Sequence, residues 1–123
     1  MDRAVVPPGW PREVRAPAVP GWEETAAPWL LDLCPPDYRT YPVLRRHPVV
    51  LARFTALHVE HAQAAVRRGL SEARAVLRDV AEPDTVDQAV TALQAEQARL
   101  LAASRAVTLV EEALRGKRFV ARL

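Results

Sequence analysis

The chain has 123 residues, of which 50% are hydrophobic and 26% charged, and its formal net charge is +2. This composition is sufficient for the core of one compact domain and too apolar for a disordered chain. The apolar runs are short and no basic stretch leads into one at the start, so we expect neither a membrane span nor a signal peptide, and we predict a cytoplasmic protein. Sixteen Arg against one Lys, with abundant Ala and Val, are typical of a GC-rich bacterial genome.

The residues that carry nucleophilic or phosphate-binding chemistry are few and scattered. The single cysteine, Cys34, cannot form an internal disulfide and precedes two prolines, so we interpret it as a small buried hydrophobe. Ser71 and Ser104 are the only serines and neither lies in a G-x-S-x-G turn, while the four glycines are too far apart for a phosphate-binding loop. We therefore predict no catalytic residues, no cofactor and no enzymatic activity.

Residues 1–22 form a Pro/Trp-rich segment that we predict to be an extended arm. Ten of the eleven prolines lie in the first 48 residues, and proline favours extended backbone over regular helix. Within the arm "VPPGW" is echoed by "AVPGW", two Pro-Gly turns that each present a tryptophan. Trp10 and Trp22, together with Trp29, are our candidates for partner binding. The alternative is that the arm folds back and its indoles cover the core of the protein itself.

Residues 23–123 are predicted to form a helical domain. A short helix is expected over about 23–33 and is stopped by "CPP", and two long helices are expected over about 48–81 and 84–115. Asp84 is the expected N-cap of the last helix, and Gly116 its end. Since two helices of similar length are joined by a tight turn, the sequence predicts a long antiparallel helical hairpin and an all-α fold.

The apolar stripe of the first long helix changes phase near Gly69. Val50, Phe54 and Leu57 lie on a face about a quarter turn away from Val66 and Leu70. A kink, a break at Ser71 or a change of packing partner would each explain this shift, and the helix lengths favour a continuous or kinked helix.

A two-helix hairpin buries only one stripe per helix and needs a further layer. Either the arm and the short helix supply it, or two hairpins pair into a dimeric four-helix arrangement. We therefore expect a non-enzymatic adaptor or regulatory protein that contacts its own copy, as a homodimer, or another protein.

His58 and His61 lie one turn apart in "LHVEHAQ", on the apolar side of their helix. The antiparallel register places Glu111 opposite His58 and Ser104 opposite His61, which predicts a buried polar cluster of these four residues. Metal binding through the histidines is a third hypothesis, but three or four ligands are required and the Glu-x-x-His pattern is missing, so no metal site is predicted.

The open end of the hairpin is the second candidate site. We expect basic residues from both ends of the helical domain to gather there, which would suit phosphate or an acidic protein. This predicted basic patch consists of Arg45, Arg46, Arg53, Arg115, Lys117 and Arg118. A nucleic-acid-associated protein is therefore the alternative function, although the sequence contains no recognised nucleic-acid motif.

Overall fold

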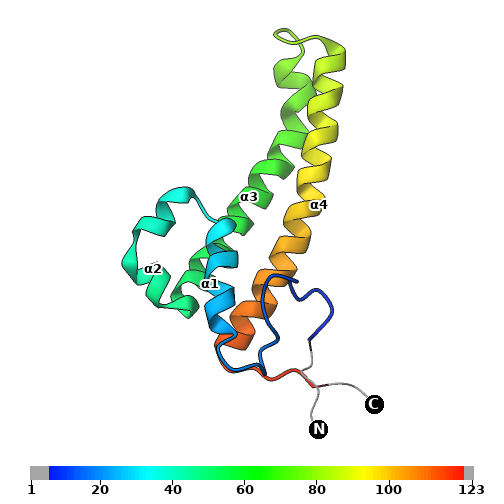
Figure 1. The fold of residues 1–123 in the computed structure, drawn as a ribbon. Coiled ribbons are helices and arrows are strands. Elements are labelled where there is room, and N and C mark those ends of the chain that lie inside the picture. Colours follow the sequence, from blue (N-terminus) through cyan, green and yellow to red (C-terminus); the bar gives the residue numbers. More distant parts are fainter. Residues whose placement is uncertain (1–5, 121–123) are drawn as a thin grey trace.

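The computed structural model describes residues 6–120, which form helices and turns and no β-strand (Figure 1). No helix in this part of the chain is both long and apolar enough to cross a membrane. The elements, in chain order, are α1 (Glu23–Asp32), the 3₁₀-helix η1 (Pro36–Thr40), α2 (Pro42–Arg46), α3 (Pro48–Leu77) and α4 (Pro83–Leu114).

α3 and α4 form the predicted antiparallel hairpin, and several side chains set its register. Arg74 Nη1 lies 2.6 Å from Asp87 Oδ1 near the turn. At the other end α4 stops at Gly116, whose φ of 101° allows the amides of Gly116 and Lys117 to bond the carbonyls of Ala113 and Glu112. The start of α4 differs from the prediction: Glu82 is the N-cap and Pro83 the first helical residue, because a proline at that position gives up no helical hydrogen bond.

α3 is continuous through Gly69, so the break considered at Ser71 does not occur. A Cβ atom on Gly69 would lie 3.2 Å from Leu93 Cδ1 of α4. The glycine therefore permits close packing of the two long helices. The phase change of the apolar stripe instead marks a change of packing partner. α1, α2 and α4 all pack on α3, and Figure 1 shows α1 and α2 beside its first half, whereas α4 runs along its whole length.

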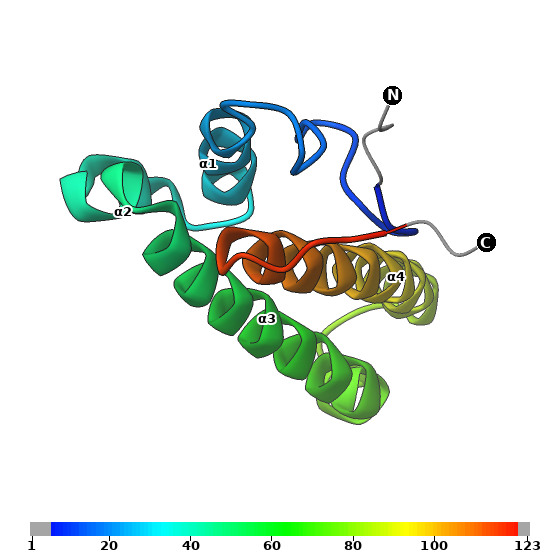
Figure 2. The same cartoon turned by 90° about the horizontal axis from the view of Figure 1, so that it is seen from below.

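A third layer covers one half of the hairpin. α1 packs mainly on α3 and also touches α4, and viewed from below it lies on one side of the α3–α4 pair (Figure 2). The contiguous core contains Leu30 of α1, Leu51 and Val59 of α3, and Val107 and Val110 of α4. Along the hairpin its last members are Val66 and Leu100. We call residues 62–103 the distal half and the other described residues the base.

Residues 6–22 lie against the base through two turns of the same design. In each turn the tryptophan amide donates to a carbonyl three residues earlier, from Trp10 to Pro7 (3.1 Å) and from Trp22 to Val19 (3.1 Å). Gly9 and Gly21 have φ of 94° and 76°, as the third position of a type II turn requires. The indole of Trp10 donates to the Val14 carbonyl and its ring lies 5.7 Å from that of Trp22. The segment is thus a series of turns that covers its own domain.

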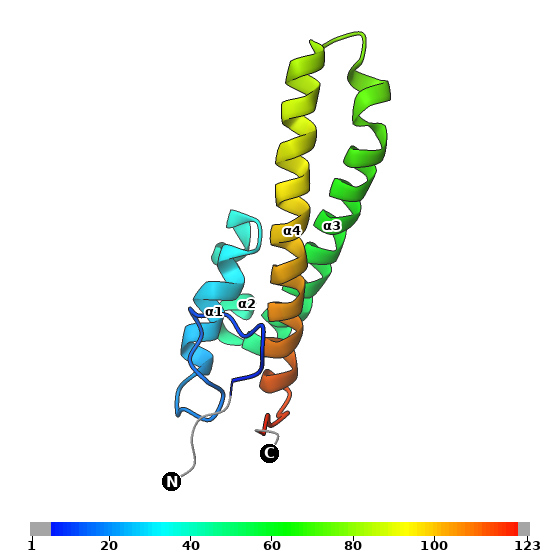
Figure 3. The same cartoon turned by 90° about the vertical axis from the view of Figure 1, so that its right-hand side faces the viewer.

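The distal half extends beyond this third layer (Figure 3). α1 has 10 residues and α3 has 30, which correspond to lengths of about 15 Å and about 45 Å. One side of the hairpin is therefore covered near α1 and uncovered near the turn.

Candidate functional site

A single stripe of α3 passes from the covered to the uncovered part of the hairpin. Its members follow alternating steps of four and three residues, so they lie on one side of the helix. In order they are Leu51, Thr55, His58, Ala62, Ala65, Gly69, Glu72 and Val76. Leu51 and Thr55 are fully buried, whereas Ala65 is exposed and Val76 is 65% exposed. The same side of α3 is core in the base and surface in the distal half.

α4 has a matching stripe. Ala113, Val110 and Ala106 are buried in the base, and the continuation in the distal half is partly buried or exposed. That continuation consists of Ala103, Arg99, Glu96, Ala92 and Ala89. We define the distal face as these five residues together with Ala62, Ala65, Gly69, Glu72 and Val76 of α3.

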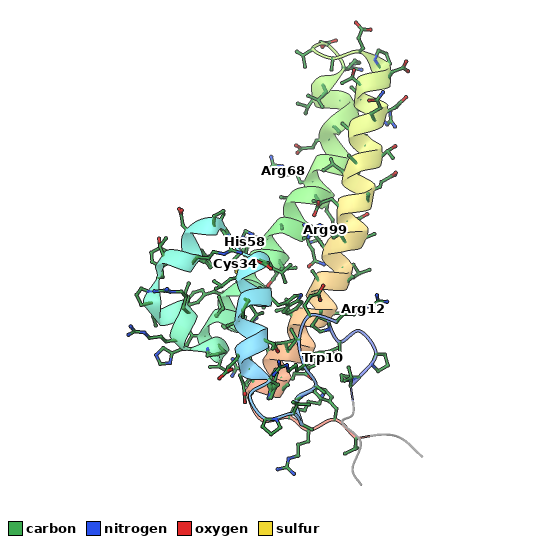
Figure 4. All side chains as sticks on the ribbon, viewed as in Figure 1. Trp10, Arg12, Cys34, His58, Arg68 and Arg99 are labelled. Carbon is green, nitrogen blue, oxygen red and sulfur yellow. The ribbon has the colours of Figure 1, made fainter. Side chains whose placement is uncertain are left out.

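The charged groups of the distal face occur as ion pairs within each helix. Arg68 Nε lies 2.9 Å from Glu72 Oε1 on α3, and Arg99 pairs with Glu96 on α4. Figure 4 shows Arg68 and Arg99 on neighbouring helices above α1. At the turn, Val80 is 77% exposed beside Asp79 and Glu82. The face thus combines small apolar side chains with balanced charge.

The boundary between covered and uncovered α3 lies at a buried hydrogen bond. Thr55 Oγ1 donates its only hydrogen to the Leu51 carbonyl (2.8 Å), so in the 3.1 Å contact of Cys34 Sγ with Thr55 Oγ1 the thiol is the donor. Burial raises the pKa of Cys34, and this effect outweighs the charge of Arg39, which lowers it. A protonated thiol therefore ties the end of α1 to α3.

The predicted buried cluster of His58, His61, Ser104 and Glu111 is not formed. His61 is exposed, and His58 is partly buried beside Cys34 at the end of α1 (Figure 4). Ser104 lines a pocket of about 200 Å³ with Glu60 and Gln63, on the other side of α3. The expected register is correct to within about one turn, but the histidines face α1 and solvent rather than α4.

Glu111 is buried and bound by arginines rather than by His58. Its Oε2 lies 3.2 Å from Arg115 Nη2 and 3.5 Å from Arg53 Nε, and both arginine side chains are at least half exposed. Among residues 6–120 no group of three or more His, Cys, Asp or Glu side chains is placed to hold a metal ion.

The basic residues of the predicted patch are separated from one another, and several of them pair with carboxylates. Arg53 and Arg115 bind Glu111, and Lys117 Nζ lies 2.8 Å from Glu112 Oε2. Arg45 and Arg46 lie on the wall of a separate groove whose other wall carries Glu23 and Glu24. Arg118 lies in another pocket, beside Lys117 and Phe119. The six cations therefore form no single surface.

The tryptophans proposed as partner contacts pack on the protein itself. Trp22 is buried in the core, which removes it from any partner-binding surface, and Trp10 and Trp29 are partly buried against the core. The exposed large apolar side chains lie elsewhere. Besides Val76 and Val80 they include Phe54 and Leu57 of α3, so the prediction that these two side chains lie in the packing stripe is wrong.

Sequence reasoning missed the distal face. Its signal was present, because the four-and-three spacing from Leu51 continues to Val76 without a partner helix of matching length. Comparison with protein-family models, with curated proteins and with solved structures found no match.

The buried thiol of Cys34 predicts a pH effect on stability. The pKa of Cys34 is raised in the folded state above its ordinary value of 9.0. The contribution of the neutral thiol to the free energy of unfolding is therefore fully present below the ordinary pKa and is lost as the pH rises through the raised pKa. Urea unfolding across the alkaline range should therefore show the wild type losing more stability than Cys34→Ser, which keeps a hydroxyl donor but does not titrate there. Parallel pH profiles for the two proteins would contradict this role.

The burial of Glu111 predicts that replacing this residue and replacing its two arginine partners have different effects on the free energy of unfolding. Glu111→Leu should change the free energy of unfolding by less than about 1 kcal/mol, because Arg53 and Arg115 remain hydrated. The double variant Arg53→Gln with Arg115→Gln should cost about 1 to 3 kcal/mol, because it leaves a buried carboxylate without its cations. Urea denaturation of both proteins measures the difference. A larger loss from Glu111→Leu would show that the carboxylate stabilises another group.

Proposed function

We propose that the protein is a non-enzymatic helical interaction protein, an adaptor or regulatory subunit, and that the distal half of its hairpin is the binding element. The supporting observation is that the α3 stripe, fully buried at Leu51 and Thr55, continues uncovered to Val76. A second helical layer placed there would continue the packing already present in the base.

The distribution of the core supports this proposal. The base holds most of the contiguous core, which includes side chains of the N-terminal turns and of α1 and extends into the distal half only as far as Val66 and Leu100. In the rest of the distal half Ala73 and Val86 are buried, whereas Val76 and Val80 are exposed to water. An apolar surface on a projecting element, rimmed by polar residues, is a common sign of a protein-binding site.

The charge arrangement favours a protein partner over nucleic acid. Binding to a phosphate backbone requires several Lys or Arg side chains that are not already paired with carboxylates. In the predicted basic patch, three of the six cations already bind Glu111 or Glu112. On the distal face Arg99 is paired with Glu96, and Glu72 is paired with Arg68 beside the face. A balanced surface of this kind suits complementary protein charges.

Site-specific photo-crosslinking tests this function. A benzoylphenylalanine at Val76, on the distal face, should give a cross-linked product of defined mass in cells that naturally make the protein. The matched control is the same residue at Arg67, which is exposed on the opposite side of α3 and should give none. Mass spectrometry of the products identifies the bound chain. Absence of a product at Val76, or equal products at both positions, would overturn the proposal.

A further inference from the structure

We propose that the occupant of the distal face is a second copy of this chain, turned end for end, with a two-fold axis that crosses α3 near Leu70. This inference rests on the proposed function and names its partner. Under such an axis each copy covers the uncovered half of the other, and every contact occurs twice.

The lengths of the elements fit this arrangement. α1 ends where Cys34 bonds Thr55, so the uncovered stretch of α3 begins at His58 and ends at the turn that contains Val80. Its midpoint lies near Leu70. A reversed copy centred there places its own turn beside His58, just beyond the end of α1, so the two bases lie at opposite ends without overlap.

The area is sufficient for a specific dimer. The uncovered stretch is about 33 Å long and two adjacent helices are roughly 20 Å wide. Covering it removes about 650 Å² from each copy, or about 1,300 Å² in total, which exceeds the roughly 1,000 Å² expected of a specific interface.

Charge is complementary under the same axis. Arg68 Nε lies 2.9 Å from Glu72 Oε1 within each chain. Because the two residues lie at equal distances on either side of Leu70, the axis also brings Arg68 of each copy near Glu72 of the other, so the two ion pairs form one network. The turn, with the carboxylates of Asp79 and Glu82, meets His61 and His58, whose ring N–H groups are donors.

Apolar contacts follow from the same register. Val76, the large exposed side chain of the α3 stripe, lies over Ala62 and Ala65 of the second copy. These alanines are small enough to receive it, and Gly69 beside the axis adds no side chain between the helices. Val76 and Ala65, which are exposed in the single chain, are thereby removed from water.

A charge-swap mixing experiment tests this arrangement in the full-length chain. The wild type should sediment with twice the 13.6 kDa mass of one chain at micromolar concentration. Arg68→Glu and Glu72→Arg should each weaken self-association at least tenfold, because each sets like charges against each other across the axis. The control Arg67→Glu makes the same charge change on the opposite side of α3 and should leave the dimer intact.

The mixture distinguishes contact between copies from pairing within one helix. The Arg68→Glu chain carries carboxylates at both positions, and the Glu72→Arg chain carries guanidinium groups at both. When the two weakened variants are combined, opposite charges face each other on both sides of the axis, so a mixed dimer should form at wild-type strength.

Two results would overturn the inference: a monomeric wild type, or variants that remain separate when mixed. A cross-link from Val76 to a different protein, alongside a monomeric chain, would leave the proposed function standing and reject the second copy as partner.

Discussion

The hydrogen bond from Cys34 to Thr55 marks the point on α3 where coverage by α1 ends, and the rest of the structure depends on that point. Two prolines follow Cys34, and the residue before a proline is disfavoured in helical geometry, so α1 ends and the chain turns away through η1 and α2. α1 therefore covers a third of the length of α3. Every feature of the distal half, from exposed Val76 to the unpartnered α4 stripe, follows from the shortness of that third layer.

The elements of the fold were predictable from the sequence because their signals are local. Apolar spacing and the turn near Pro83 predicted the hairpin, Gly116 its end, and the two Pro-Gly pairs their turns. The direction of the N-terminal segment was not predictable, because a tryptophan after a Pro-Gly turn suits a partner groove and a core equally. In the structure the contacts among Trp10, Trp22 and Phe119 join segments about a hundred residues apart. No local pattern specifies such a contact.

The predictions of the candidate sites were wrong where they depended on the direction in which a side chain points from its helix. The register brought the right stretches of α3 and α4 together, but Arg53, which lies five residues before His58 and about 140° away around α3, is the partner of Glu111. Differences of the same kind divided the predicted basic patch, because arginines expected to face solvent together bind buried or nearby carboxylates instead. Charge counted along the sequence therefore overestimated the charge available on the surface.

Amide hydrogen exchange tests the central claim most directly, because it measures how well each part of the hairpin is covered. At the lowest usable concentration, where the chain is alone, amides of residues 50–61 and 104–113 should exchange much more slowly than those of residues 67–77 and 86–99. Protection of the distal residues should then rise with protein concentration. Equal protection of both halves in the dilute chain would show that the hairpin is stable without a further layer, and would contradict the account.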